Sequence, residues 1–313
     1  MEFLRFLEGI RNPVLDFIFS TVTHLGEETI LIAIGLFIFW CVGKKHGYYI
    51  LSVGFIGLIL NSILKLLFRI PRPWVADEDF TIVESARGEA TGYSFPSGHT
   101  QTSVGLFGSI ARSIKLNWVR ISCIAICILV PFSRMYLGVH TPADVIVSSL
   151  IGIALIFTVY PLLNKAYESF KGMNIFFAAL ALFGIVGILF IELFPFPADL
   201  NMSNYESSAK GIYKLFGCIL AIWLCYVIDS KYIKFETKAV WWAQIIKFSL
   251  GLAIVLGIKA GVKAIFGFVG FEGFFADAVR YFLVVLAGAG AWPMTFRFFS
   301  SLGKRSSMEG SDR

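Results

Sequence analysis

Apolar and polar positions follow one another along this chain in long blocks. Apolar runs close to the roughly 20 residues that an α-helix needs to cross a bilayer recur over the whole length. The pattern predicts about eight membrane spans, or nine if all of them hold, at 28–44, 47–70, 99–114, 118–137, 142–164, 173–194, 208–229, 240–266 and 274–299. We therefore expect an all-α fold, a polytopic transmembrane helix bundle.

The two ends of the chain break this pattern. Residues 1–27 are interrupted by charge too often to span easily, so we expect an amphipathic helix that lies at the membrane interface. The segment does not resemble a cleaved signal peptide. We expect a core at 28–170 that holds nearly all of the unusual polar residues, a block of further transmembrane helices at 171–300, and a polar tail at 301–313.

Composition and charge add an orientation. Hydrophobic residues make up 57% of the 313 residues, charged residues 15%, and the mean hydropathy is +0.76, outside the usual range of soluble proteins. The formal net charge is +6, and basic residues gather in every second loop, at 44–46, 112–120, 165–171 and 231–238. The alternating loops, above all 71–98, are richer in acid. By the positive-inside rule, 71–98 faces outward from a plasma membrane.

Three polar clusters fall on this outer face. They are KLLFRIPRP at 65–73, PSGH at 96–99, and SRMYLGVHTPAD at 133–144. Cations gathered at this density repel one another and lose hydration, so they need a negatively charged partner. A bound tetrahedral oxyanion such as phosphate would supply the missing charge.

The residue types fit that ligand. Arg72 and Arg134 can each hold phosphate oxygens through a forked pair of hydrogen bonds, with Lys65 as a point charge. Ser97 and Gly98 come directly before a predicted helix, where free backbone N–H groups and the helix dipole favour an anion. Glycine also lets the backbone approach the ligand closely.

Two histidines suggest two roles. Asp144 can accept a hydrogen bond from one ring nitrogen of His140, which leaves the other nitrogen to attack phosphorus in line. His99 can then protonate the leaving alcohol oxygen. Taken singly, each cluster has a plainer interpretation. Thr141 to Asp144 is also an ordinary helix-capping box, and PSGH is also a turn followed by a helix cap. The basic residues of the Lys65 segment can also flank a span and snorkel to the membrane interface.

Together the three clusters resemble the type 2 phosphatidic acid phosphatase (PAP2) superfamily. Its signature reads K-x6-RP, then PSGH, then SR-x5-H-x3-D, and every position is matched within about 30–166. The resemblance implies an α-helical membrane core and a metal-free hydrolase of phosphoric esters or diphosphates. It further implies a phosphohistidine at His140, a leaving-group acid at His99, and phosphate contacts from Lys65, Arg72, Ser97, Gly98 and Arg134.

The resemblance leaves the reaction partly open. We expect a lipid phosphate phosphatase whose substrate is an anionic lipid such as phosphatidic acid, phosphatidylglycerol phosphate, undecaprenyl diphosphate or a sphingoid phosphate. A phosphotransferase that uses the same site, and a transporter or scaffold with a degenerate site, are the alternatives. Membrane lipids are expected as partners, and nucleic acid and cofactors are not. The sequence offers no evident cluster of carboxylates and histidines for a metal.

Basic residues also occur on the expected outer side of the C-terminal block, against the positive-inside trend. They are Lys210, Lys214, Lys259, Lys263 and Arg280. They either snorkel to lipid phosphates or line a basic groove for an anionic lipid headgroup. Lys259 and Lys263, four residues apart, are expected to share a helix face.

Overall fold

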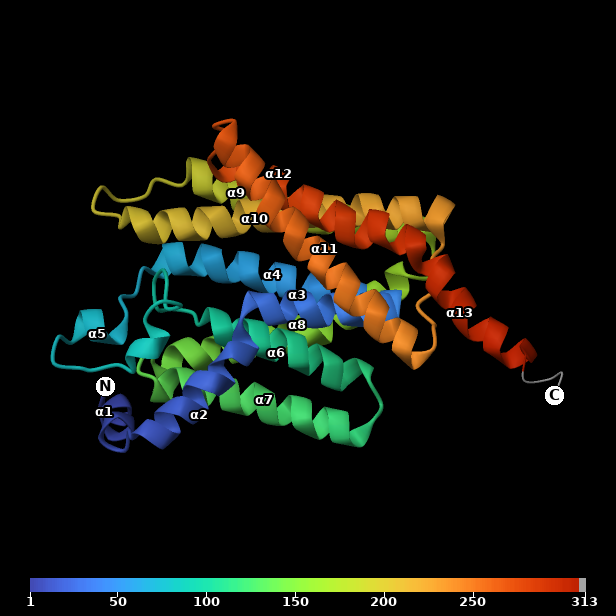
Figure 1. Ribbon diagram of the computed structural model, residues 1–313. Coiled ribbons are helices and arrows are strands. Elements are labelled where there is room, and N and C mark those ends of the chain that lie inside the picture. The colour runs from blue at the N-terminus through green and yellow to red at the C-terminus, as the bar shows by residue number, and fades with distance from the viewer. Residues whose placement is uncertain (310–313) are drawn as a thin grey trace. The chain divides into compact units, whose positions relative to one another are not determined.

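The computed structural model describes residues 1–309 of the chain, and their side chains as far as residue 302. The described part contains helices and no strand (Figure 1). The α-helices are α1 (Glu2–Gly9), α2 (Pro13–Thr23), α3 (Glu28–Phe37), α4 (Lys44–Phe68), α5 (Pro73–Ala76), α6 (Gly98–Ser113), α7 (Asn117–Tyr136), α8 (Pro142–Ala166), α9 (Phe170–Leu193), α10 (Met202–Ile228), α11 (Trp241–Phe268), α12 (Phe274–Val285) and α13 (Phe296–Glu309). Short 3-10 or π segments are η1 (His24–Gly26), η2 (Ile38–Val42), η3 (Glu84–Ala86), η4 (Asp229–Ile233), η5 (Leu286–Ala291) and η6 (Trp292–Thr295).

Seven helical segments among the described residues are long and apolar enough to cross a membrane. They are Lys44–Ala76, Asn117–Tyr136, Pro142–Ala166, Phe170–Leu193, Met202–Ile233, Trp241–Phe268 and Phe274–Leu302. An eighth is possible if Pro13–Gly26 and Glu28–Val42, which are bent by 55° at their junction, form one broken span. The predicted all-α transmembrane bundle is confirmed, and the chain is an integral membrane protein.

The segment predicted to span at 99–114 differs from the others. Helix α6 has 16 residues, so it is about 24 Å long and shorter than a bilayer core of about 30 Å. It does not meet the criteria for a candidate span, and polar side chains from Thr100 to Ser103 are buried along it. It packs most extensively against α7. Helix α6 is therefore a core element that carries polar residues inside the protein.

The N-terminal segment forms two helices where the sequence predicted one. The break between α1 and α2 ends at Asn12, which is the N-cap of α2. Its side chain accepts a hydrogen bond from the Leu15 N–H at 3.1 Å. Leu4 and Leu7 of α1 are buried in a cluster with Phe80 and Ile82. The N-terminus therefore packs on the loop at 71–98.

Contacts divide the chain into two compact units that are discontinuous in sequence. Unit 1 comprises Met1–Ile32, Tyr49–Pro161 and Val186–Ile212, and unit 2 comprises Ala33–Tyr48, Leu162–Ile185 and Tyr213–Arg313. All three polar clusters fall in unit 1. The domain division expected from the sequence stays a prediction. Helix α13 continues into the expected polar tail, and residues 310–313 of that tail lie outside the described residues.

Candidate active site

The three polar clusters come together at helix ends within unit 1. Figure 1 shows the C-terminal ends of α4 and α7 at the same end of this unit as the N-terminal ends of α6 and α8. The long loop at 71–98 connects α4 to α6 there. Helix ends supply unpaired backbone groups and an oriented dipole, so this arrangement suits a charged ligand.

His140 is held in one orientation between α7 and α8. The ring is 1% exposed, and its Nδ1 lies 3.3 Å from Oδ2 of Asp144. Its Nε2 lies 2.9 Å from Nη1 of Arg72. A guanidinium can only donate, so Nε2 is the acceptor and the ring proton sits on Nδ1, facing the carboxylate. The lone pair needed for attack is therefore on Nε2.

Asp144 combines both roles that the sequence left open. Its Oδ2 accepts hydrogen bonds from the Thr141 N–H at 2.7 Å and from Oγ of Ser94 at 2.6 Å, and it also faces His140. The Asp144 N–H donates to Oγ1 of Thr141 at 3.3 Å, which completes a capping box at the start of α8. Ser94 was missed in the sequence because it precedes the PSGH motif.

Arg72 uses its donors on backbone carbonyls as well as on His140. Nε donates to Gly92 at 3.1 Å, Nη2 to Thr91 at 2.7 Å, and Nη1 to Val139 at 2.9 Å. It is 6% exposed, so it does not snorkel. In this structure Arg72 joins the loop at 71–98 to the segment that carries His140.

Arg134 is buried with donors to spare. Nη1 donates to Oγ1 of Thr23 at 2.7 Å. Nε and Nη2 have no hydrogen-bond partner among the described residues, although the side chain is fully buried. Two unpaired buried N–H groups on one guanidinium are costly without an acceptor. A tetrahedral oxyanion suits these two donors chemically, because it accepts from both at once.

The PSGH segment forms the start of α6, one residue before the predicted start. Ser97 is the N-cap, with Oγ accepting from the Thr100 N–H at 3.4 Å, and its own N–H donates to the carbonyl of Asp144 at 3.2 Å. The N–H groups of Gly98 and His99 have no acceptor among the described residues. Only Asn61 Oδ1, at 3.8 Å, would meet a Cβ on Gly98. The open donors of the cradle therefore come from Gly98 and His99.

Lys65 lies one turn before the end of α4. Its Nζ donates to the carbonyl of Tyr93 in the loop at 71–98. It interacts electrostatically with His140, as do Arg72 and Arg134. The structure thus brings the three predicted cations close enough to act on His140.

These charges set the protonation state of His140. Burial lowers the pKa of His140 well below its usual value, and the positive charges of Arg72, Arg134 and Lys65 lower it further. The imidazole is therefore neutral near pH 7, as a nucleophile must be.

His99 has a carboxylate partner that the sequence did not reveal. Its Nε2 lies 3.3 Å from Oε2 of Glu89, and its side chain is 15% exposed. The hydrogen bond from His99 is the main cause that lowers the pKa of Glu89 to about 2. Glu89 is ten positions away along an irregular loop, so no periodic signal links the two residues.

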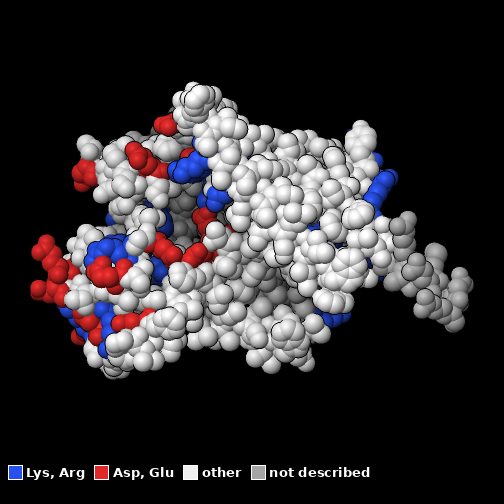
Figure 2. All heavy atoms as spheres, in the orientation of Figure 1, with Lys and Arg blue, Asp and Glu red and all other residues white. Residues whose placement is uncertain are grey.

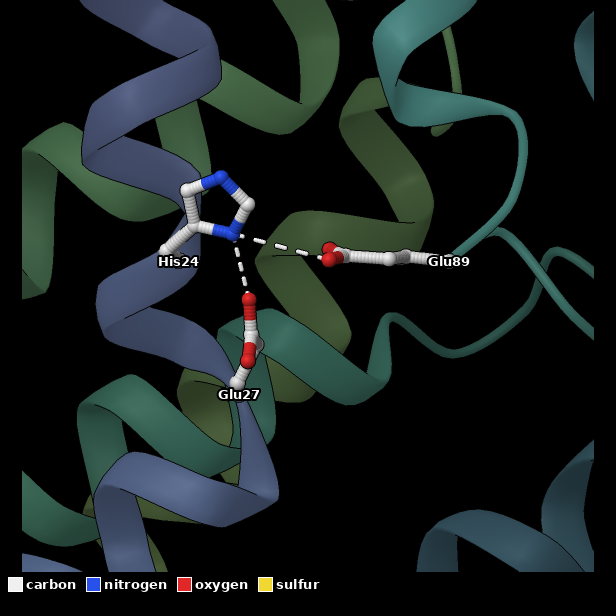
Figure 3. Close-up of side chains that lie close together, drawn as sticks. All are labelled: His24, Glu27 and Glu89. Atoms are coloured by element: carbon white, nitrogen blue, oxygen red, sulfur yellow. Dashed lines mark hydrogen bonds and ion pairs between the residues drawn. The ribbon is translucent and has the colours of Figure 1, made fainter.

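Glu89 also takes part in a cluster that only the fold brings together. The ligand atoms of His24, Glu27 and Glu89 lie within 4.8 Å of one another, and Figure 3 shows Nδ1 of His24 facing both carboxylates. No such cluster was expected from the sequence, and the expectation that the protein needs no metal stays a prediction. These residues are 65 positions apart at the extremes, and only the fold joins them.

Unit 2 gathers three of the predicted C-terminal cations around one ring. The ring centroid of Tyr281 lies 5.7 Å from Nζ of Lys214, 5.9 Å from Nζ of Lys259, and 5.1 Å from Cζ of Arg280. Arg280 also forms an ion pair with Asp277. We call these five residues the Tyr281 cluster.

The other two predicted cations lie outside that cluster. Lys263 is exposed on α11, and among the described residues no cation–π contact joins it to Tyr281. Lys210 is exposed on the part of α10 that belongs to unit 1.

Acidic and basic side chains gather on the surface near the site. Figure 2 shows them at the end of unit 1 that carries α5. The loop at 71–98 supplies Asp77, Glu78, Asp79 and Glu84. Glu84 pairs with Arg87 at 2.7 Å, and Asp77 with Arg5 at 2.8 Å. These pairs hold the loop to itself and to α1.

Comparison with known proteins agrees with this geometry. The PAP2 superfamily model matches residues 45–168, and the model of the PAP2 superfamily phosphatase transmembrane extension matches residues 213–305. The second match covers helices about which the signature says nothing.

Relatives with established names are phosphatases. Undecaprenyl-diphosphatase BcrC of Bacillus subtilis is 30% identical over 159 residues, which cover 49% of this chain and 78% of that protein. Phosphatidylglycerophosphatase B of the same organism is 32% identical over 165 residues, 48% of this chain and 76% of that one. The crystal structure of Aquifex aeolicus LpxE is 26% identical, covers 51% of this chain and 93% of its own, and gives a TM-score of 0.44. The predicted class, a phosphoric ester or diphosphate hydrolase, is confirmed, and this chain belongs to the PAP2 superfamily.

Proposed function

We propose that this protein hydrolyses the phosphomonoester or diphosphate of a membrane lipid through a phosphohistidine on His140. The observation that carries the proposal is the pair of contacts on that ring. Asp144 lies at Nδ1 and Arg72 at Nε2, so a buried, neutral imidazole has its lone pair among cations. A nucleophile so placed suits attack on phosphorus.

The first step forms the phosphoenzyme. Nε2 of His140 attacks phosphorus, the bond from phosphorus to the leaving oxygen breaks, and His99 gives that oxygen a proton. The free donors of Arg134 and the N–H groups of Gly98 and His99 stabilise charge on the equatorial oxygens. Asp144 balances the positive charge that develops on the ring of His140.

The second step releases phosphate. A water molecule gives a proton to the now neutral His99 and attacks phosphorus, and the P–N bond to His140 breaks. Inorganic phosphate leaves, and both histidines return to their starting protonation states. The cycle therefore needs no net proton from elsewhere in the protein.

The substrate class rests on the relatives and on the membrane location. Two relatives are named for undecaprenyl diphosphate and phosphatidylglycerophosphate, both of which are anionic lipids. Phosphatidic acid and sphingoid phosphates carry a terminal phosphomonoester, as phosphatidylglycerophosphate does. The Tyr281 cluster supports a headgroup contact in unit 2, as a second element of lipid recognition.

We further propose that the site lies on the extracytoplasmic face of the plasma membrane and that the reaction uses no metal ion. The loop charges support the first point through the positive-inside rule. The second is supported by the cations Lys65, Arg72 and Arg134, which can supply the charge stabilisation that a metal supplies elsewhere.

Phosphate release from purified lipids tests this proposal. Full-length protein in detergent should release phosphate from at least one of phosphatidic acid, phosphatidylglycerol phosphate and undecaprenyl diphosphate, with the same rate in EDTA. Vanadate, which mimics five-coordinate phosphorus, should inhibit. Loss of turnover in EDTA would remove the metal-free mechanism, and phosphoryl transfer to an added lipid in place of water would assign a phosphotransferase.

A further inference from the structure

Glu89 stands between two histidines, and the loop at 71–98 gives it no other ion-pair partner among the described residues. Its Oε2 lies 3.3 Å from Nε2 of His99. Its Oε1 lies 3.5 Å from Nδ1 of His24, and Figure 3 shows this second contact. One carboxylate thus bridges the predicted leaving-group acid and a residue of the N-terminal segment.

The far side of this bridge is itself fixed. Nδ1 of His24 also contacts Glu27, whose second oxygen accepts from Oγ1 of Thr29 at 2.8 Å. Gly26, between these residues, packs directly on α6. A Cβ there would lie 2.8 Å from the carbonyl oxygen of His99, so only glycine allows this approach. The N-terminal segment is therefore built against the start of α6.

The bridge determines which nitrogen of His99 meets the substrate. A carboxylate only accepts, so Nε2 of His99 carries a proton and donates it to Glu89. Nδ1 is then the nitrogen that can give a proton to the leaving oxygen and later take one from water. This is the logic by which a carboxylate fixes the tautomer of a catalytic histidine.

The negative charge of Glu89 also offsets groups that disfavour a positive charge on His99. Burial and the cation of Arg134 lower the pKa of His99 below its usual value, and the carboxylates of Glu89 and Glu27 oppose this shift without reversing it. His24 is on the solvent side of Glu89, with 57% of its side chain exposed. Glu89 is thus the charged group in direct contact with His99 that stabilises its acid form.

We propose that Glu89 is a positioning residue that orients His99 and favours its acid form as the leaving-group acid, with His24 and Glu27 holding Glu89 in place. The inference rests on the proposed function, because it needs His99 to be the acid. It assigns a role to the acidic loop at 71–98 and to the packing of the N-terminal segment.

The test compares two substrates in the full-length enzyme. Phosphatidic acid has an alkoxide leaving group that needs a proton, whereas 4-nitrophenyl phosphate has a leaving group that does not. Glu89→Gln should lower kcat on phosphatidic acid on the order of 10- to 100-fold and change kcat on 4-nitrophenyl phosphate by less than about threefold. Glu84→Gln, in the same loop but paired only with Arg87, is the matched control and should match wild type on both.

The pH profile separates this role from a structural one. Activity on phosphatidic acid should fall as pH rises through the pKa of His99. Removing the carboxylate destabilises the imidazolium, so this alkaline limb should move to lower pH in Glu89→Gln. Glu89→Asp keeps the charge. It should recover part of kcat on phosphatidic acid and return the alkaline limb part of the way to its wild-type pH. It also serves as the test variant if Glu89→Gln does not fold, because a shortened carboxylate should still slow phosphatidic acid more than 4-nitrophenyl phosphate.

Three results would overturn the inference. One is equal loss on both substrates with an unchanged alkaline limb, which is the result of a structural role. Another is no loss on either substrate. The third is turnover that EDTA abolishes and Zn²⁺ restores in wild type but not in Glu89→Gln, which would assign His24, Glu27 and Glu89 to a metal. A wild-type enzyme inactive on every phosphate would instead remove the proposed function, and the inference with it.

Discussion

Arg72 and His140 are joined by a hydrogen bond of 2.9 Å between Nη1 and Nε2. This contact places the lone pair of the nucleophile on the nitrogen that faces the cations, and Asp144 holds the opposite nitrogen at 3.3 Å. Under the proposed mechanism, Arg72 occupies the position that a phosphate must approach. A ligand that displaces this contact would take the lone pair directly and leave Arg72 as an adjacent donor.

Asp144→Asn tests the role of the carboxylate on the far side of that ring. The amide lacks the charge that keeps Nδ1 of His140 protonated and balances the ring as it attacks. We expect kcat to fall by about 10²- to 10⁴-fold, as expected when a catalytic histidine loses its carboxylate. Thr141→Ala removes the hydroxyl that caps Asp144 N–H and is the control for the capping role. It should cost about 1 kcal/mol in unfolding free energy with kcat retained. Equal loss of kcat in both variants would contradict a catalytic role for Asp144.

The acid limb of kcat/KM should lie below pH 6.5. Because burial and the neighbouring cations lower the pKa of His140, its neutral form persists at more acidic pH than that of an ordinary histidine. As pH falls through 6.5, kcat/KM should show no loss, and it should decline only below that pH. A pH series on a substrate whose own ionisation is known makes the measurement. An acid limb above 6.5 would contradict this account of the free enzyme.

Motif spacing was sufficient to place the central residues of the site. PSGH predicted a helix start, and α6 begins at Gly98 with Ser97 as its cap. The interval from His140 to Asp144 predicted their contact, because it crosses only the first turn of α8. These relationships are local, so sequence carries them. The count of spans depended on hydropathy alone, and it included the short, internally packed α6.

The remaining site contacts depend on tertiary structure. Glu89 meets His24 because the loop at 71–98 folds back on the N-terminal segment, and no periodicity encodes that return. Arg72 binds three loop carbonyls, whereas its residue type suggested only a phosphate ligand. Lys259 and Lys263 were grouped by their helical spacing. The fold separates them, because Lys259 contacts the ring of Tyr281 on α12.

The orientation of the protein can be tested by labelling. Single cysteines at Glu84 and at Lys115, each in a background without native cysteines, should differ in intact cells. Both positions are exposed, on loops that the charge pattern assigns to opposite faces. An impermeant maleimide should label the cysteine at 84 and not the one at 115, and both should react after the membrane is permeabilised. The reverse pattern would contradict an extracytoplasmic site.

The Tyr281 cluster predicts a difference between two lysines on one helix. Lys259→Gln should raise KM for a large anionic lipid several-fold, while a short soluble phosphate ester is unaffected because it needs only the catalytic residues. Lys263→Gln, one turn further along α11 and exposed, is the matched control and should resemble wild type. If the two variants behave alike on both substrates, the cluster has no special role in headgroup binding and snorkelling accounts for both lysines.

The most direct test of the central claim is to trap the phosphoenzyme. The enzyme is mixed with a labelled phosphate ester, quenched rapidly and digested with trypsin. The predicted result is an alkali-stable, acid-labile phosphate on the peptide from Met135 to Lys165, in which His140 is the single histidine. The label should be absent from His140→Ala. With a good leaving group it should accumulate in His99→Ala, because the base for the second step is missing. Turnover by wild type without any such label, or a label on another residue, would contradict the account.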